Sequence, residues 1–92
     1  MPGHVFHPGH EELHGVTVVV AGVSGKTYLG RYHERNQRGV VLRDAGVFDP
    51  TQAETSVEDW LARQRKFGIR VEHRVLLLPG DEAGRIERFS SE

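Results

Sequence analysis

The sequence predicts a mainly β protein, a small five-stranded bent antiparallel open barrel with a short N-terminal helix and one inserted helix. Three observations predict this fold. Apolar runs separated by tight turn signals fill residues 16–48, and two similar runs follow at 70–78 and 83–89. A helical pattern interrupts the runs once. Glycines lie inside two of the runs, where a small barrel needs its strands to bend.

Size and composition bound the class of protein. Ninety-two residues suggest one domain with a modest core, and we expect residues 1–92 to form it. No apolar run is long enough to cross a bilayer, so we expect no membrane partner. The absence of cysteine and of a visible secretory signal predicts a cytoplasmic protein. The formal net charge of −1 argues against a generally basic protein that coats nucleic acid, although it permits a local basic patch.

The N-terminal segment is rich in histidine. Residues 1–9 contain two prolines and two glycines and predict a flexible arm, whereas residues 10–14 predict one helical turn that Gly15 ends. On a continuous helix His7, His10 and His14 would share one face, and imidazole suits zinc, nickel or copper. Because a proline and a glycine interrupt that helix, we expect no metal or other cofactor. The three histidines remain the alternative metal site.

The first three strands are predicted as a meander. The run at 16–23 is apolar on both faces, which predicts a strand buried on both sides. Residues 22–27 end like a phosphate-binding loop, but Val20 occupies the place of the motif's first glycine and strand chemistry follows, so a hairpin is expected. The second strand, 26–33, and the third, 40–48, each contain one glycine as a bending point. Gly39, between them, is expected to take the special backbone angle of the polar turn.

A helix is predicted over 56–67. Ser56 begins a capping box, and Gly68 is a good C-terminal stop. The period of 3.6 residues places five side chains near one face: Val57, Trp60, Leu61, Gln64 and Phe67. We therefore expect this helix to dock on the barrel through Trp60 and Phe67.

The last two strands are predicted to carry subunit contacts. The fourth begins with alternating polar and apolar residues and ends in Val75–Leu78, which is apolar on both faces. A chain of this size has little left to cover an outer apolar face, and the strands at the sheet edges would expose unpaired backbone groups. A cyclic, head-to-tail homo-oligomer satisfies both needs. The predicted interface residues are Val75, Leu76, Leu78 and Ile86.

Together these segments resemble the Sm-like (LSm) family, whose fold is a short helix followed by five bent strands, and more distantly other SH3-like barrels. The resemblance covers about three quarters of the chain. Its first motif corresponds to Val16–Val20, Tyr28–Tyr32, Glu34–Arg38 and Val40–Asp44, and its second to Arg74–Gly80 and Ala83–Phe89. The resemblance implies a ring in which strand four of one subunit pairs with strand five of the next. The RNA pocket of the family differs here, because Asn36 falls near its acidic position and Pro79-Gly80 replaces its Arg-Gly pair.

Three functions remain open from the sequence. The first is an Sm-like ring that binds single-stranded RNA, because Arg planes and imidazoles stack on bases and cations meet phosphates. The second is a structural or accessory oligomer that binds no nucleic acid, and the third is a His-rich metal-binding protein. We expect no enzyme, since no nucleophile–base constellation is visible. The predicted RNA-binding residues are Arg31, His33, Arg35, Asn36 and Arg38.

Overall fold

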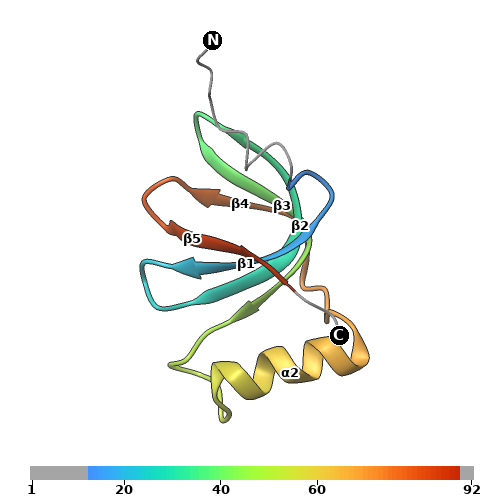
Figure 1. Cartoon of the computed structure of the whole chain (residues 1–92). Coiled ribbons are helices and arrows are strands. Elements are labelled where there is room, and N and C mark those ends of the chain that lie inside the picture. Colours follow the sequence, from blue (N-terminus) through green and yellow to red (C-terminus); the bar gives the residue numbers. More distant parts are fainter. Residues whose placement is uncertain (1–12, 90–92) are drawn as a thin grey trace.

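The computed structural model describes residues 13–89 and shows one bent antiparallel sheet with a single helix in that range (Figure 1). The elements, in chain order, are β1 (Thr17–Gly22), β2 (Thr27–Asn36), β3 (Gly39–Phe48), α2 (Val57–Phe67), β4 (His73–Pro79) and β5 (Ala83–Arg88). The strand order in the sheet is β4-β3-β2-β1-β5. The predicted mainly β fold of five bent strands with one inserted helix is therefore confirmed. Of the predicted N-terminal turn, Leu13 and His14 lie in a turn, while the rest of it and the predicted arm lie outside the described residues.

The sheet stays open because its two end strands do not pair with each other. Within residues 13–89, β4 bonds only to β3 and β5 bonds only to β1, although β4 and β5 are consecutive in the chain. Each of these strands therefore keeps one edge of backbone N–H and C=O groups that the sheet does not use. The two strands that were expected to have unpaired edges, the fourth and the fifth, are the two end strands of the sheet.

Gly30 lets β2 and β3 bend against each other. A Cβ on Gly30 would lie 2.9 Å from the Cβ of Ala45 and 3.0 Å from the carbonyl oxygen of Arg43. The register between the two strands also shifts here, between Leu29 and Arg31, which marks a β-bulge. In that bulge Asp44 takes φ +51°, a left-handed conformation that Asp tolerates better than most residues. The bend predicted from a mid-strand glycine thus comes from a close backbone approach and a bulge together.

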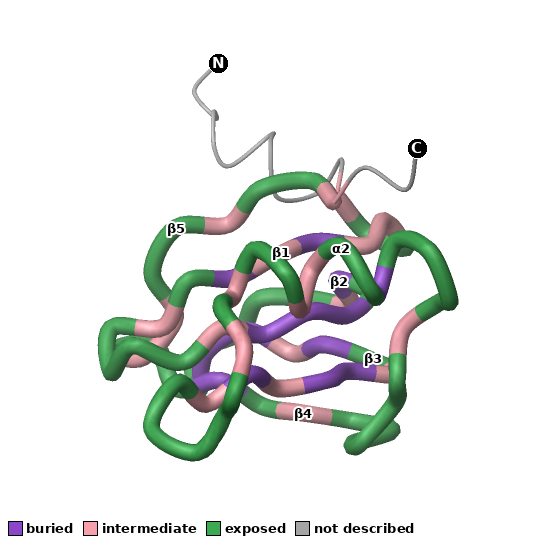
Figure 2. Tube along the Cα trace, turned by 90° about the horizontal axis from the view of Figure 1, so that it is seen from below, coloured by how far each residue is buried: buried purple, intermediate pink, exposed green. Residues whose placement is uncertain are grey.

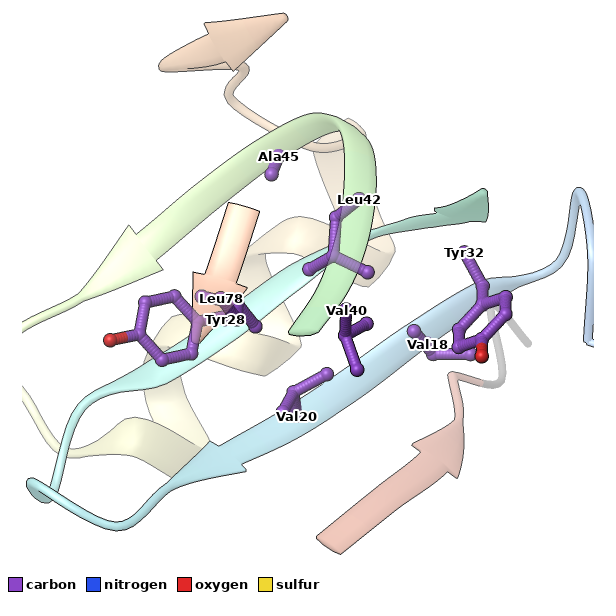
Figure 3. Close-up of a cluster of buried hydrophobic side chains, with 8 residues drawn as sticks. All are labelled: Val18, Val20, Tyr28, Tyr32, Val40, Leu42, Ala45 and Leu78. Carbon is purple, nitrogen blue, oxygen red and sulfur yellow. The ribbon is translucent and has the colours of Figure 1, made fainter. Parts of the chain in front are cut away.

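The main core lies inside the curve of the sheet. Eight buried side chains from β1, β2, β3 and β4 gather there (Figure 3): Val18, Val20, Tyr28, Tyr32, Val40, Leu42, Ala45 and Leu78. Buried segments follow the middle of the sheet, and exposed segments follow α2, the turns and much of β4 (Figure 2). On one face of β1, Val18 and Val20 are fully buried. On the other face Thr17 and Val19 are partly buried and Ala21 is exposed. The prediction of a first strand buried on both faces is therefore wrong for its end.

Helix α2 is capped as its sequence predicts. The Ser56 side-chain oxygen accepts a hydrogen bond from the Asp59 backbone N–H at 3.1 Å. Gly68, with φ +91°, donates its N–H to the carbonyl oxygen of Gln64 at 2.9 Å. These bonds satisfy backbone groups that a helix end leaves without partners.

Of the two residues that were predicted to dock α2 on the barrel, Trp60 does so and Phe67 does not. The ring of Trp60 lies 5.5 Å from that of Phe48, between centroids, and also approaches Gly46, so it covers the outer face of β3. Phe67 is 77% exposed, and the buried position of the last turns is Gln64, which accepts a bond from the Arg70 N–H at 2.9 Å. The prediction for Phe67 is wrong. Helical periodicity defines a face of the helix, but it does not define how far along the helix the sheet extends.

The structure also corrects one predicted interface residue. Leu78 is 2% exposed and belongs to the core of its own chain, so its side chain is not available to another subunit. Leu76 and Ile86 are partly buried against the same core. Val75 is 63% exposed and Leu77 is 41% exposed, because alternate residues of a strand point to opposite faces. The apolar run of β4 thus supplies both a core face and an outer face, and only the outer one is open to a partner.

Glu82 ties the turn between β1 and β2 to the turn between β4 and β5. Its carboxylate accepts hydrogen bonds from the Ser24 N–H at 3.0 Å, the Ser24 hydroxyl at 2.6 Å and the Tyr28 hydroxyl at 2.6 Å. The Ser24 and Tyr28 bonds hold the pKa of Glu82 below its usual range. Burial, followed by the bond to Glu82 and its charge, raises the pKa of Tyr28 to about 12.

We expect this arrangement to make the fold sensitive to alkali. The pKa of Tyr28 rises from 10.0 to about 12 on folding, so its stabilising contribution is complete below pH 10 and is lost as the pH rises towards 12. At about 1.4 kcal/mol per pKa unit, the loss in the free energy of unfolding approaches roughly 3 kcal/mol. Urea unfolding of wild type and Tyr28→Phe between pH 9 and 12 measures it. The slope should be clearly smaller in Tyr28→Phe, and equal slopes in the two proteins would contradict this role for Tyr28.

Candidate nucleic-acid interface

The predicted RNA-binding residues all lie on β2, from its middle onward, and on the turn that follows it. The structure separates them into two groups. Arg35, Asn36 and Arg38 lie at the tip of the β2–β3 hairpin and are exposed. Arg31 and His33 lie nearer the middle of the sheet and line a separate pocket.

Asn36 shapes the hairpin tip. Its side-chain amide donates to the Glu34 carboxylate at 2.9 Å, and its side-chain oxygen accepts from the Arg38 backbone N–H at 2.8 Å. The second bond forms an Asx turn, in which the Asn side chain accepts from the backbone two residues further on. Asn36 therefore holds the turn in place, while Arg35 and Arg38 extend their guanidinium groups from it into solvent.

The hairpin tip lies directly beside the turn between β4 and β5. Gly39 pairs with Pro79, and a Cβ on Gly39 would collide with the carbonyl oxygen of Leu78 and lie 3.0 Å from the backbone nitrogen of Gly80. Gly39 has φ +142°, which confirms its predicted special backbone angle. The close approach brings two chain reversals together at one end of the sheet, so the two arginines stand beside exposed backbone of the β4–β5 turn.

The second group lines a small pocket on the side of the sheet, which we call the β2 pocket. Its volume is about 200 Å³, and its lining residues are His14, Gly15, Arg31, Tyr32, His33 and Arg43. The His14 Nδ1 donates to the carbonyl oxygen of His33 at 2.6 Å, and the two imidazole rings lie 5.5 Å apart between centroids. The N–H of Gly15 donates to the carbonyl oxygen of Tyr32 at 2.8 Å. The segment before β1 is thereby fixed against β2 and forms one wall of the pocket.

Two residues of the β2 pocket are not among the predicted RNA-binding residues. Arg43 faces Arg31 across the β2–β3 ladder, and His14 was predicted only as a member of the metal alternative. The alternation within β3 indicates that Arg43 and Asp44 point apart, but it cannot show which residue of β2 lies opposite Arg43. The pairing of Arg43 with Arg31 depends on the bulge at Gly30, and the alternation of residues along either strand does not predict where that bulge lies.

Neither a metal centre nor a membrane span is seen in the described range. Within residues 13–89 no three His, Asp or Glu side chains are grouped so that they could hold a metal ion. His7 and His10 of the alternative metal site lie outside the described residues, and His14 is hydrogen-bonded to His33. In the same range, no helix has the length and apolar character needed to cross a membrane.

Comparison with known proteins identifies the fold. A scan against family models found no match, and neither did a search of curated proteins. Among solved structures, the chain is similar to the crystal structure of the SmAP (LSm) protein from Methanococcus vannielii, with a TM-score of 0.58 and 17% sequence identity. The match covers 94% of this chain and 97% of that chain, so it includes the bent sheet and the segments that join its strands. The protein therefore has the Sm-like fold.

Proposed function

We propose that the protein assembles into a cyclic homo-oligomer and binds single-stranded RNA at its β2–β3 hairpin tips. The observation that carries the RNA part is the pair of exposed arginines, Arg35 and Arg38, on a turn that Asn36 holds in shape beside the β4–β5 turn. A cyclic assembly would repeat this pair once per subunit. Repetition turns a weak contact into a strong one, since the second and later contacts of one strand become intramolecular.

The assembly part is supported by the two open edges of the sheet. β4 and β5 each leave one side without a strand partner among the described residues, and β4 exposes Val75 and Leu77. An open groove of about 780 Å³ lies beside β4 and is lined in part by Leu76, Leu77 and Trp60. Pairing of β4 with β5 of another copy would cover the backbone edges and part of this apolar surface. Because the two edges differ, such a contact is head-to-tail, and a head-to-tail contact forms a ring when the rotation from one copy to the next closes.

The chemistry of the hairpin tip favours a single strand. Arginine offers a planar guanidinium that stacks on an unpaired base and binds a phosphate through two parallel N–H groups. Arg35 and Arg38 lie three residues apart on the same hairpin tip, so the two cations can act on one strand of RNA. The Asn36 side-chain amide donates to the Glu34 carboxylate at 2.9 Å, so it also fixes the position of this acidic neighbour.

The test is the salt dependence of binding to a fluorescent hexauridylate. The double variant Arg35→Gln/Arg38→Gln should bind at least about tenfold more weakly at low salt, because charge-assisted hydrogen bonds are lost. The slope of log K against log salt concentration should fall by about 1.4, since each phosphate contact on a single strand contributes about 0.7. Fluorescence anisotropy at several KCl concentrations measures both quantities.

A matched control removes the same charge elsewhere. Arg63 and Lys66 are exposed on α2, and Arg63→Gln/Lys66→Gln lowers the charge of the chain by the same amount. Its affinity and slope should equal those of wild type. If both double variants lose affinity equally, the hairpin tip is not the RNA site. If wild type binds no hexauridylate, the RNA part of the proposal is wrong, and an oligomer without nucleic-acid binding remains.

A further inference from the structure

We propose that the β2 pocket is a binding site for a phosphate group, separate from the hairpin tip. The proposal rests on the geometry of the pocket itself. Only the assignment of the phosphate to an RNA strand depends on the proposed function.

The first observation is an unfavourable pairing of like charges. Arg31 and Arg43 are directly opposite each other in the β2–β3 ladder, and both line the pocket. Like charges at such positions destabilise a sheet. A bound anion between the two guanidinium groups would attract both of them and so offset their mutual repulsion.

The second observation is that, among the described residues, an acidic partner compensates one of the two arginines and not the other. The Asp44 carboxylate forms an ion pair with Arg31, from a bulge position with φ +51°. Arg43 is exposed and forms no ion pair within residues 13–89. The pocket therefore keeps one net positive charge when its histidines are neutral, and this matches the single negative charge of a phosphodiester.

The third observation is the size and the wall of the pocket. A volume of about 200 Å³ lies below the range of roughly 300–1,000 Å³ typical of drug-sized ligands, but it holds a phosphate group with some water. Gly15 forms part of the wall, and a Cβ there would meet nothing within 4 Å, so the space beside it is open. Paired guanidinium groups favour an oxyanion with several acceptor oxygens, and the neutral imidazole of His33 can offer one N–H group.

Two variants test the site in opposite directions. Arg43→Gln removes the uncompensated charge and should weaken phosphate binding at least about tenfold. Asp44→Asn frees the guanidinium of Arg31 and should tighten phosphate binding by up to about fivefold. Asn tolerates the left-handed backbone of position 44, so this variant keeps the bulge. Arg63→Gln, on α2, loses the same charge as Arg43→Gln and should bind phosphate like wild type.

The measurement is a titration of the full-length chain with inorganic phosphate at constant ionic strength, followed by the amide resonances of Gly15 and His33. Saturable shifts are expected in wild type, with the hairpin-tip amide of Gly39 unmoved. An Arg43→Gln isotherm equal to that of wild type would overturn the proposal. So would weaker binding by Asp44→Asn, or shifts that do not saturate.

A second arm identifies the source of the phosphate group. If the phosphate belongs to an RNA strand, hexauridylate moves the Gly15 and His33 resonances, and Arg43→Gln lowers the salt slope of its binding by about 0.7. If hexauridylate leaves these resonances unmoved while inorganic phosphate shifts them, the site takes free phosphate groups. Because the phosphate titration does not involve the hairpin tip, its result stands whether or not the protein binds RNA.

Discussion

Gly39→Ala is expected to lower the free energy of unfolding by about 3 kcal/mol. Two costs add at this position. The backbone has φ +142°, where a residue with a Cβ is strained by roughly 1–3 kcal/mol. The added carbon would also collide with the carbonyl oxygen of Leu78, and overpacking costs typically another 1–3 kcal/mol. Thermal unfolding followed by circular dichroism should show Tm falling by about 12 °C or more.

Gly25→Ala is the matched control for this prediction. Gly25 also has a positive φ, +103°, but a Cβ there would meet nothing within 4 Å. Its replacement should therefore carry only the backbone cost, roughly 1 kcal/mol. If the two alanine variants lose equal stability, the contact between Gly39 and the β4–β5 turn contributes little. At temperatures where Gly39→Ala is still folded, weaker hexauridylate binding is expected, because the hairpin tip must move away from Leu78.

Val75→Glu is expected to convert the proposed oligomer to monomers. Val75 is 63% exposed on the outer face of an edge strand, so in the single chain a carboxylate there stays in water and the change should alter folding by less than about 0.5 kcal/mol. In a contact between copies the same carboxylate would be buried without a partner, which costs several kcal/mol. Light scattering after size exclusion should give a mass of several subunits for wild type and of one subunit for Val75→Glu.

Val23→Glu controls for the effect of a charge on any exposed valine. Val23 is 72% exposed in the turn between β1 and β2, outside both edge strands of the sheet. Its variant should keep the mass of wild type. A wild-type protein that is monomeric over the accessible concentration range would disprove assembly, and a Val75→Glu protein of unchanged mass would place the contact elsewhere.

The elements of this fold were predictable from the sequence because each depends on local chemistry. Alternating apolar residues and turn signals located all five strands within three residues of their bounds at each end. Ser56 and Gly68 marked the ends of α2, since a helix needs caps wherever it stops. Gly39 was predicted to take a special angle, and the clash that an alanine would cause explains why glycine stands there.

What only the tertiary structure decided depends on how distant segments align. Leu78 faces inward and Val75 outward, although both lie in one apolar run, because the register of β4 on β3 selects the face that completes the core. Phe67 is 77% exposed, although the helical period places it on the same face as Trp60.

The same holds for the candidate sites. Arg31 meets Arg43 only through a bulge whose position depends on Gly30, and Glu82 meets Ser24 from 58 residues away. Local patterns define which residues form a strand or a helix, since period and caps act within a few residues. Registers, bulges and the reach of one element over another follow from packing between segments far apart in the chain, and no pattern within one segment records them.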